Sequence, residues 1–259
     1  MALSQEKTDH VERVLKASLR RKFADYRPEP AAMPFHTRLL GKDRLALYSF
    51  IHSLSTNFGT SVFEPVAVVL AAGNFKIAKS HTKSGDAIYE GALFEIQRIM
   101  DGLATAEIEP DKNVEIESIR RKCQAGAVRK VKPTVVDLYL EAYTGELYMF
   151  DLKTAKPNAG GFREFKRTLL EWVAATLAIN PKSQISTLIA IPYNPYEPEP
   201  YRRWTMRGML DLPNELKVAE EFWDFLGGSG TYSALLDCFE RVGIELRDEI
   251  DRFFKRFGH

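Results

Sequence analysis

The sequence has few cysteines, no clustered histidines and no long apolar runs. Its 259 residues include two cysteines, Cys123 and Cys238, and no Cys-x-x-Cys pair, so neither a disulfide framework nor a thiolate zinc site is indicated. The five histidines show no His-x-x-x-His or His-Glu-x-x-His spacing, so the zinc-protease motif is absent. No apolar run approaches the ~18 residues of a membrane helix, and the first residues lack an apolar signal core. We therefore expect a cytoplasmic protein that does not insert into a membrane.

The chain also lacks a strong net charge. Its 36 lysines and arginines balance 35 aspartates and glutamates, which leaves a net charge of +1 with neutral histidines. This total does not favour a nucleic-acid-binding protein, but it does not exclude one either, because a local basic surface is enough for binding. With 45% hydrophobic and 27% charged residues, the composition is that of a globular protein with a sizeable core. Because α/β domains of this length commonly stay undivided, we expect a single domain over residues 1–259.

Apolar residues recur at helical spacing in most of the chain. We expect Gly59 to end the helix over residues 43–58, and Lys166 to lie on the exposed face of the long amphipathic helix over residues 162–180. The pattern predicts helices over residues 5–26, 43–58, 62–72, 86–103, 162–180, 215–226, 232–242 and one that ends at about Phe257.

β-branched and aromatic residues dominate residues 134–140, 147–153 and 185–191, which predicts three strands. A turn-forming stretch around Gly145 joins the first two into a hairpin. The predicted order is strand, strand, helix and strand, with further helices before and after it. This order indicates an α/β domain with a mixed β-sheet flanked by helices. We place its catalytic core at about residues 130–195.

The sequence contains three [D/E]-x-Lys triplets, and the predicted elements separate them. Those at residues 164–166 and 215–217 fall on predicted helices, where residues i and i+2 point about 200° apart. Asp151-Leu-Lys153 falls on a predicted strand, where residues i and i+2 face the same side. Only Asp151 and Lys153 can therefore aim a carboxylate and an ammonium group at one phosphate.

A second carboxylate, Asp137, lies on the partner strand. Asp137 and Asp151 are each seven residues from Thr144, so an odd-length loop centred there sets them side by side, whereas a two-residue loop separates them. Paired carboxylates repel unless a cation lies between them, and oxygen ligands of this kind suit Mg²⁺. Asp137 and Asp151 would hold the metal, and Lys153 would orient or help deprotonate the attacking water. The alternative is an exposed hairpin face on which Asp151 and Lys153 are merely solvated.

These residues resemble a known nuclease motif. The spacing from Asp137 to Asp151-x-Lys153 is similar to the PD-(D/E)xK signature, with Val136 in the place of its proline. Residues 53–64, 151–158, 191–196 and 220–228 resemble the TdeIII-type family of type II restriction endonucleases, and the resemblance extends from about Phe35 to the C-terminus. It implies a restriction-endonuclease-like fold and a Mg²⁺-dependent homodimer. Its substrate would be double-stranded DNA, cut at a short palindrome that in this family is typically GGNCC.

The resemblance also makes a helix-borne glutamate, Glu64, a candidate catalytic residue at the metal site. From the residues alone, Ser61-Val-Phe-Glu64 instead predicts a capping box, in which the serine hydroxyl accepts from a backbone amide and the glutamate bonds back. Both interpretations stay open at this point.

The best candidate for reading bases is the proline-rich segment at residues 193–203. Arginine and asparagine can make paired hydrogen bonds to guanine and adenine edges. Alternatively, the segment is a surface connection whose tyrosines cap the core. Lys156 is a candidate for a phosphate contact. The candidate DNA-binding residues are thus Lys156, Tyr193, Asn194, Arg202 and Arg203.

Two other functions remain open. One is a DNA repair or recombination nuclease with the same core, which would nick particular DNA structures instead of cutting at a sequence. The other is a non-catalytic DNA-binding module, which would not cut with Mg²⁺ or Mn²⁺.

Overall fold

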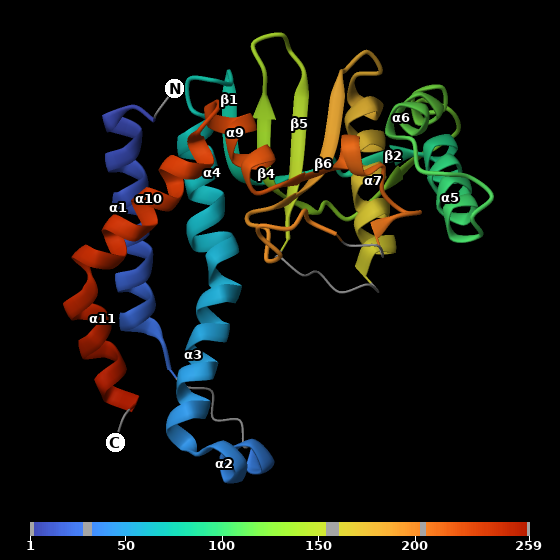
Figure 1. The fold of residues 1–259 in the computed structure, drawn as a ribbon. Helices are drawn as coiled ribbons and strands as arrows, with labels where there is room; N and C mark the ends of the chain where they lie inside the picture. Colours follow the sequence, from blue (N-terminus) through green and yellow to red (C-terminus); the bar gives the residue numbers. More distant parts are fainter. Residues whose placement is uncertain (1–2, 28–32, 154–160, 203–205, 258–259) are drawn as a thin grey trace. The chain divides into compact units, whose positions relative to one another are not determined.

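The computed structural model describes residues 3–27, 33–153, 161–202 and 206–257 of the chain (Figure 1). It divides into two compact units, one of residues 1–70 with 228–259 and one of residues 71–227. The predicted catalytic core at residues 130–195 falls within the second unit.

The first unit is helical and has an aromatic centre. The ring of Phe253 lies 4.6 Å, centre to centre, from the rings of both Phe23 and Phe50. Val11 and Leu15 are buried, as the helical spacing of the first segment predicts. The elements are α1 (Gln5–Asp25), α2 (Pro34–Leu40), α3 (Lys42–Phe58), η1 (Gly59–Phe63), α4 (Glu64–Ala71), α10 (Thr231–Glu245), α11 (Arg247–Phe254) and η4 (Lys255–Phe257).

The helices predicted over residues 43–58 and 62–72 form one continuous helix. The prediction that Gly59 ends α3 is wrong, because the π-helical turn η1 connects α3 to α4. The predicted capping box is also wrong, because the Ser61 hydroxyl donates to the carbonyl oxygen of Asn57 at 2.6 Å within the helix. Pro65 accounts for the wide turn, since it has no N–H to donate and its ring would clash with a carbonyl of a regular helix.

This continuous helix passes a simple test for a membrane span. Arg44–Ala71 has 28 residues and enough apolar side chains to cross a membrane by length and composition. Packed core helices pass the same test, and Val66, Ala67 and Leu70 are fully buried here. One such helix therefore does not indicate a membrane protein.

The second unit is built on a mixed sheet flanked by helices, as predicted. The order of its five strands is β1-β4-β5-β6-β7. The β1–β4 and β4–β5 pairs are antiparallel, and the β5–β6 and β6–β7 pairs are parallel. The strands are β1 (Ile77–Lys83), β4 (Val135–Glu141), β5 (Leu147–Leu152), β6 (Ile185–Ile191) and β7 (Leu216–Val218), and β2 (Ala87–Tyr89) pairs with β3 (Val128–Lys130) in a second sheet.

The β4–β5 hairpin has the odd-length loop that is needed to set Asp137 and Asp151 side by side. Ala142 N donates to Glu146 O at 2.8 Å, which leaves the three-residue loop 143–145. Gly145 has a φ of 88°, and this left-handed conformation is the one that such a loop needs at its last position. The predicted register is confirmed, because Leu138 lies opposite Phe150.

Helices cover the two faces of this sheet. The helix α7 (Phe162–Ile179) connects the parallel strands β5 and β6, and its Leu169 carbonyl accepts a hydrogen bond from the buried Thr187 hydroxyl of β6. Figure 1 shows α7 beside β6, with α5 (Glu90–Ala104) and α6 (Lys112–Arg120) beyond it. On the opposite face, the rings of Phe222 and Phe225 of α9 (Glu220–Gly227) lie within 6 Å of the Phe150 ring.

Parts of the second unit differ from the prediction. Residues 87–89 form β2 instead of the first turn of a helix. Residues 212–218 form α8 (Leu212–Glu215) and β7, so the helix predicted at 215–226 begins at Glu220. Lys166 is fully buried instead of exposed. Both α6 and β1 were absent from the predicted elements.

Candidate active site

The hairpin sets Asp137 and Asp151 side by side. The register, continued one step beyond Leu138 and Phe150, places Asp137 opposite Asp151. Asp137 Oδ2 accepts a hydrogen bond from Leu152 N at 2.8 Å, which holds it against the end of β5. The two carboxyl groups interact directly, and this contact helps to raise the pKa of Asp151. The predicted pairing of the two carboxylates on one face is therefore confirmed.

Lys153 completes the group at the end of β5. Its Nζ lies 2.7 Å from Asp151 Oδ1 and 4.5 Å from the centre of the Phe165 ring. An ammonium group over an aromatic face is attracted by the ring, so Phe165 steadies the cation. A Cβ on Gly161 would come within 2.8 Å of the same ring. Glycine at position 161 thus lets Phe165 reach its place under Lys153.

Asp151 is 8% exposed, so the exposed-hairpin alternative does not describe it. Burial raises the pKa of its carboxyl group, Lys153 lowers it, and Asp137 raises it again, with a net result of about 6. A carboxylate whose charge is disfavoured by burial and by a like neighbour favours a bound cation.

This raised pKa predicts a pH-dependent stability difference between the metal-free protein and its Asp151→Asn variant. A pKa raised from 3.8 to about 6 means that the folded state binds the proton more tightly than the unfolded state. As pH rises from about 4 to about 6, the wild type loses up to about 3 kcal/mol of stability that the variant does not lose. Urea unfolding in EDTA should show the variant more stable at pH 7 and the two proteins converging towards pH 4. A variant less stable at pH 7 would contradict the prediction.

The donor set of this group fits Mg²⁺. Each carboxylate keeps a second oxygen besides the one that contacts Leu152 N or Lys153 Nζ. Mg²⁺ commonly binds through one or two carboxylates and completes its shell with waters and substrate phosphate. Within the described part of the chain, no group of three His, Cys, Asp or Glu side chains is placed to hold a metal. An ion held here by Asp137 and Asp151 would therefore take its other ligands from water and substrate phosphate.

Glu64 belongs to the first unit, whereas Asp137 and Asp151 belong to the second. Its side chain is buried, with 2% exposure, at the start of α4. The capping-box interpretation is excluded by the continuous helix, so a buried carboxylate without a capping role remains at this position.

The predicted base-reading segment is a compact loop after β6. Asn194 Nδ2 donates to Glu199 O at 2.7 Å, and Asn194 Oδ1 accepts from Tyr196 N at 3.0 Å. The Asn194 amide therefore shapes the loop. Tyr193 and Arg202 are exposed. Lys156 and Arg203 lie outside the described residues.

A buried network of four charged side chains was not predicted from the sequence. Lys166 Nζ of α7 contacts Glu115 Oε2 and Glu215 Oε2, each at 2.6 Å, and Lys112 Nζ contacts Glu215 Oε1 at 2.7 Å. Burial would raise the pKa of Glu215, but the two lysines outweigh it and lower that pKa. The network joins α6, α7 and α8, and so fixes the helix that carries Phe165.

Comparison with known proteins is consistent with this geometry. Residues 3–243 match the family model described as "Type II restriction endonuclease, HinfI". The chain is 28% identical to the type II restriction enzyme HgiCII of Herpetosiphon aurantiacus over 233 residues, which cover 85% of this chain and 80% of the relative. It is 29% identical to the type II restriction enzyme MjaII of Methanocaldococcus jannaschii over 211 residues, which cover 76% of this chain and 55% of the relative.

Proposed function

Because this chain belongs to the HinfI family of type II restriction endonucleases, we propose that it hydrolyses both strands of DNA at a short palindrome with the help of Mg²⁺. The observation that carries the proposal is the buried Asp137–Asp151 pair with Lys153 on the same face of the sheet. The mixed sheet flanked by helices is consistent with a restriction-endonuclease-like fold. The PD-(D/E)xK spacing and the likeness to TdeIII-type enzymes support the same chemistry.

Asp137 and Asp151 would hold the ion. When bound, Mg²⁺ would lower the pKa of a water that it holds and would neutralise charge on the scissile phosphate. Lys153 orients the attacking water and stabilises charge on the phosphate, while its contacts with Asp151 and Phe165 limit its movement. Burial of Asp151 keeps bulk water from screening these interactions.

We assign the remaining residues by the same proposal. Arg202 and Arg203, which follow one another in the sequence, read guanine edges, and Tyr193, Asn194 and Lys156 contribute further DNA contacts. The catalytic role that the resemblance implies for Glu64 stays a prediction. The proposed site is GGNCC, the proposed domain is the whole chain, and the proposed compartment is the cytoplasm, where the DNA to be cut enters.

A digest of plasmid DNA of known sequence tests this function. With Mg²⁺ we expect discrete fragments whose sequenced ends map to one palindrome. Nicking that follows DNA structure and not sequence would favour a repair or recombination nuclease. Binding without any cleavage in Mg²⁺ or Mn²⁺ would favour a non-catalytic DNA-binding module.

We further propose a homodimer that associates through an exposed apolar surface of α2 and α3, because a palindrome presents two phosphates related by a two-fold axis. This α2–α3 surface exposes roughly 700 Å² of large apolar side chains, at about 200 Å² for each fully exposed one. A stable interface needs about 800 Å² per partner. Its members are Phe35 (83% exposed), Leu39 (82%), Leu40 (44%), Leu47 (42%), Tyr48 (62%) and Ile51 (50%).

We predict that the double variant Phe35→Glu, Leu39→Glu is a monomer that nicks DNA but forms little linear product. Two charges in a dry interface lose their hydration without a partner. Sedimentation and the ratio of linear to nicked plasmid measure the two effects. Phe94→Glu is the matched control, because Phe94 is 75% exposed on α5 in the other unit. A double variant that still sediments as a dimer would place the interface elsewhere.

A further inference from the structure

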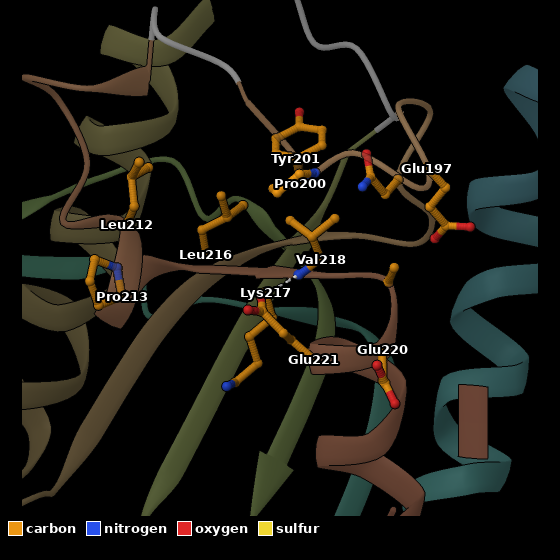
Figure 2. Close-up of a pocket in the computed structure, with 12 residues that line it drawn as sticks. Glu197, Pro200, Tyr201, Leu212, Pro213, Leu216, Lys217, Val218, Glu220 and Glu221 are labelled. Carbon is orange, nitrogen blue, oxygen red and sulfur yellow. Dashed lines mark hydrogen bonds between the residues drawn. The ribbon is translucent and has the colours of Figure 1, made fainter. Parts of the chain in front are cut away.

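A pocket of about 630 Å³ opens between the loop after β6 and the strand β7. Figure 2 shows Leu216 and Val218 projecting from β7 towards Pro200 and Tyr201. Glu197 and Glu220 both line this pocket, and Figure 2 shows the Glu197 carboxylate on the Tyr201 side of β7 and the Glu220 carboxylate on the other side. Its volume is within the range of small-molecule binding sites, about 300–1,000 Å³.

The sheet register places this pocket beside the candidate active site. Asp151 lies next to Ile189 on β6, and Ile189 lies next to Leu216 on β7. Side chains that are aligned across neighbouring strands share a face, so Leu216 faces the same side as Asp151. Two strand spacings separate them, which is about 10 Å. This distance corresponds to about three base-pair steps of DNA.

The charges at the pocket disfavour a phosphate group. Three glutamates line it: Glu197, Glu220 and Glu221. The one lysine of β7, Lys217, projects to the other face of the sheet, where its Nζ lies 4.9 Å from the centre of the Phe225 ring. A neutral ligand with amino groups would suit these carboxylates, because an ionised carboxylate only accepts hydrogen bonds.

The shape of the pocket restricts which part of DNA can enter. In a stacked duplex the base edges are recessed in the grooves and the phosphates stand outermost. A hollow in the protein surface therefore meets phosphates first, unless a base leaves the stack. Since the glutamates repel phosphates, a base outside the stack is the part that fits. An aromatic wall such as Tyr201 offers a face to a base of any type.

We propose that this pocket holds one nucleobase that is swung out of the duplex within about three base-pair steps of the cleaved phosphate. The base lies between Tyr201 and the Leu216–Val218 edge, and its exocyclic amino group donates to Glu197. This inference rests on the proposed cleavage centre at Asp151. It makes the pocket a determinant of where the enzyme cuts.

The test uses DNA duplexes that contain the cleavage site with 2-aminopurine in place of each base in turn. The full-length protein is bound in Ca²⁺ so that the DNA stays intact. We expect 2-aminopurine fluorescence to rise severalfold at one position or at its neighbours, because an unstacked probe loses quenching. Leu216→Trp, which fills the pocket, should abolish the rise and slow cleavage at least tenfold. Tyr201→Ala, on the surface loop, should do the same if the tryptophan variant does not fold.

The matched control is Ile179→Trp, which adds the same ring at an 81% exposed position of the same unit. It should keep both the fluorescence rise and the cleavage rate. Glu197→Gln should lower cleavage about tenfold, as the loss of one base contact does. No rise at any position, with normal cleavage by both Leu216→Trp and Tyr201→Ala, would overturn the pocket proposal and leave the cleavage centre intact. Absence of cleavage by the wild type would instead overturn the proposed function.

Discussion

Replacement of Asp151 by asparagine is expected to abolish DNA cleavage and to leave DNA binding nearly unchanged. The change removes the negative charge that would hold Mg²⁺ and that attracts Lys153 Nζ, 2.7 Å from Asp151 Oδ1. We expect kcat to fall at least about 10³-fold, which is about 4 kcal/mol of transition-state stabilisation. Single-turnover cleavage of a short duplex in Mg²⁺ measures the fall, and binding of the same duplex in Ca²⁺ measures affinity.

Glu141→Gln provides the matched control for this variant. Glu141 is a carboxylate of the same hairpin, opposite Leu147 at the far end of the β4–β5 ladder, and it pairs with Lys76. Its loss should leave the cleavage rate within about twofold of the wild type, because an exposed ion pair contributes at most about 1 kcal/mol to stability and nothing to the chemistry. An Asp151→Asn variant that cuts at the wild-type rate would remove Asp151 from the active site.

Replacement of Lys166 by methionine is expected to lower the stability of the fold strongly. The variant leaves Glu115 and Glu215 in the interior without the cation that contacts both at 2.6 Å. Removal of one partner from a buried ion pair costs about 3–5 kcal/mol. For a chain of this size that loss lowers Tm by roughly 10 °C. Thermal unfolding followed by circular dichroism gives the value.

Arg163→Met on the same helix is the control for Lys166→Met. Arg163 is 57% exposed at its side chain, and its Nη2 lies 3.7 Å from Asp101, so its loss should change Tm little. We also expect that replacing all four charged side chains of the network by apolar residues restores most of the stability, since no buried charge is then left alone. A Lys166→Met variant with wild-type Tm would show that the network does not stabilise the fold.

The candidate active site could be predicted because it depends on local geometry. Strand side chains alternate with a period of two, and the loop around Thr144 fixes the register over a few residues. Asp137 and Asp151 are therefore brought together by a hairpin whose whole length is visible in the sequence. Burial of Phe150 and Met149 on opposite sides of β5 follows from the same apolar run.

The buried network could not be predicted because its partners are far apart in the chain. Lys166 belongs to a polar stripe of α7 that a helical pattern assigns to solvent. Only the folded structure brings Glu115 and Glu215, about 50 residues away on either side, within hydrogen-bond distance. Lysine and glutamate are rarely fully buried unless they are paired, so the sequence alone predicts that Lys166, Glu115 and Glu215 are exposed.

The short strand β7 was missed for a different reason. Leu216-Lys217-Val218 alternates over only three residues, which is too short to compete with the apolar helix pattern that follows it. The strand forms because Ile189, Ala190 and Ile191 of β6 offer it a partner. Because β7 was not predicted, the pocket beside the proposed cleavage site could not be predicted either.

The claim that Asp137, Asp151 and Lys153 form a metal-dependent cleavage centre is tested most directly by anomalous X-ray scattering from Mn²⁺. The crystals would contain the full-length protein with a duplex that carries its cleavage site. We predict an anomalous peak in contact with the carboxylates of Asp137 and Asp151 and with the scissile phosphate, and no such peak in Asp151→Asn crystals. A Mn²⁺ ion bound to the DNA phosphate but away from both aspartates, in a complex that cleaves when warmed, would contradict the account.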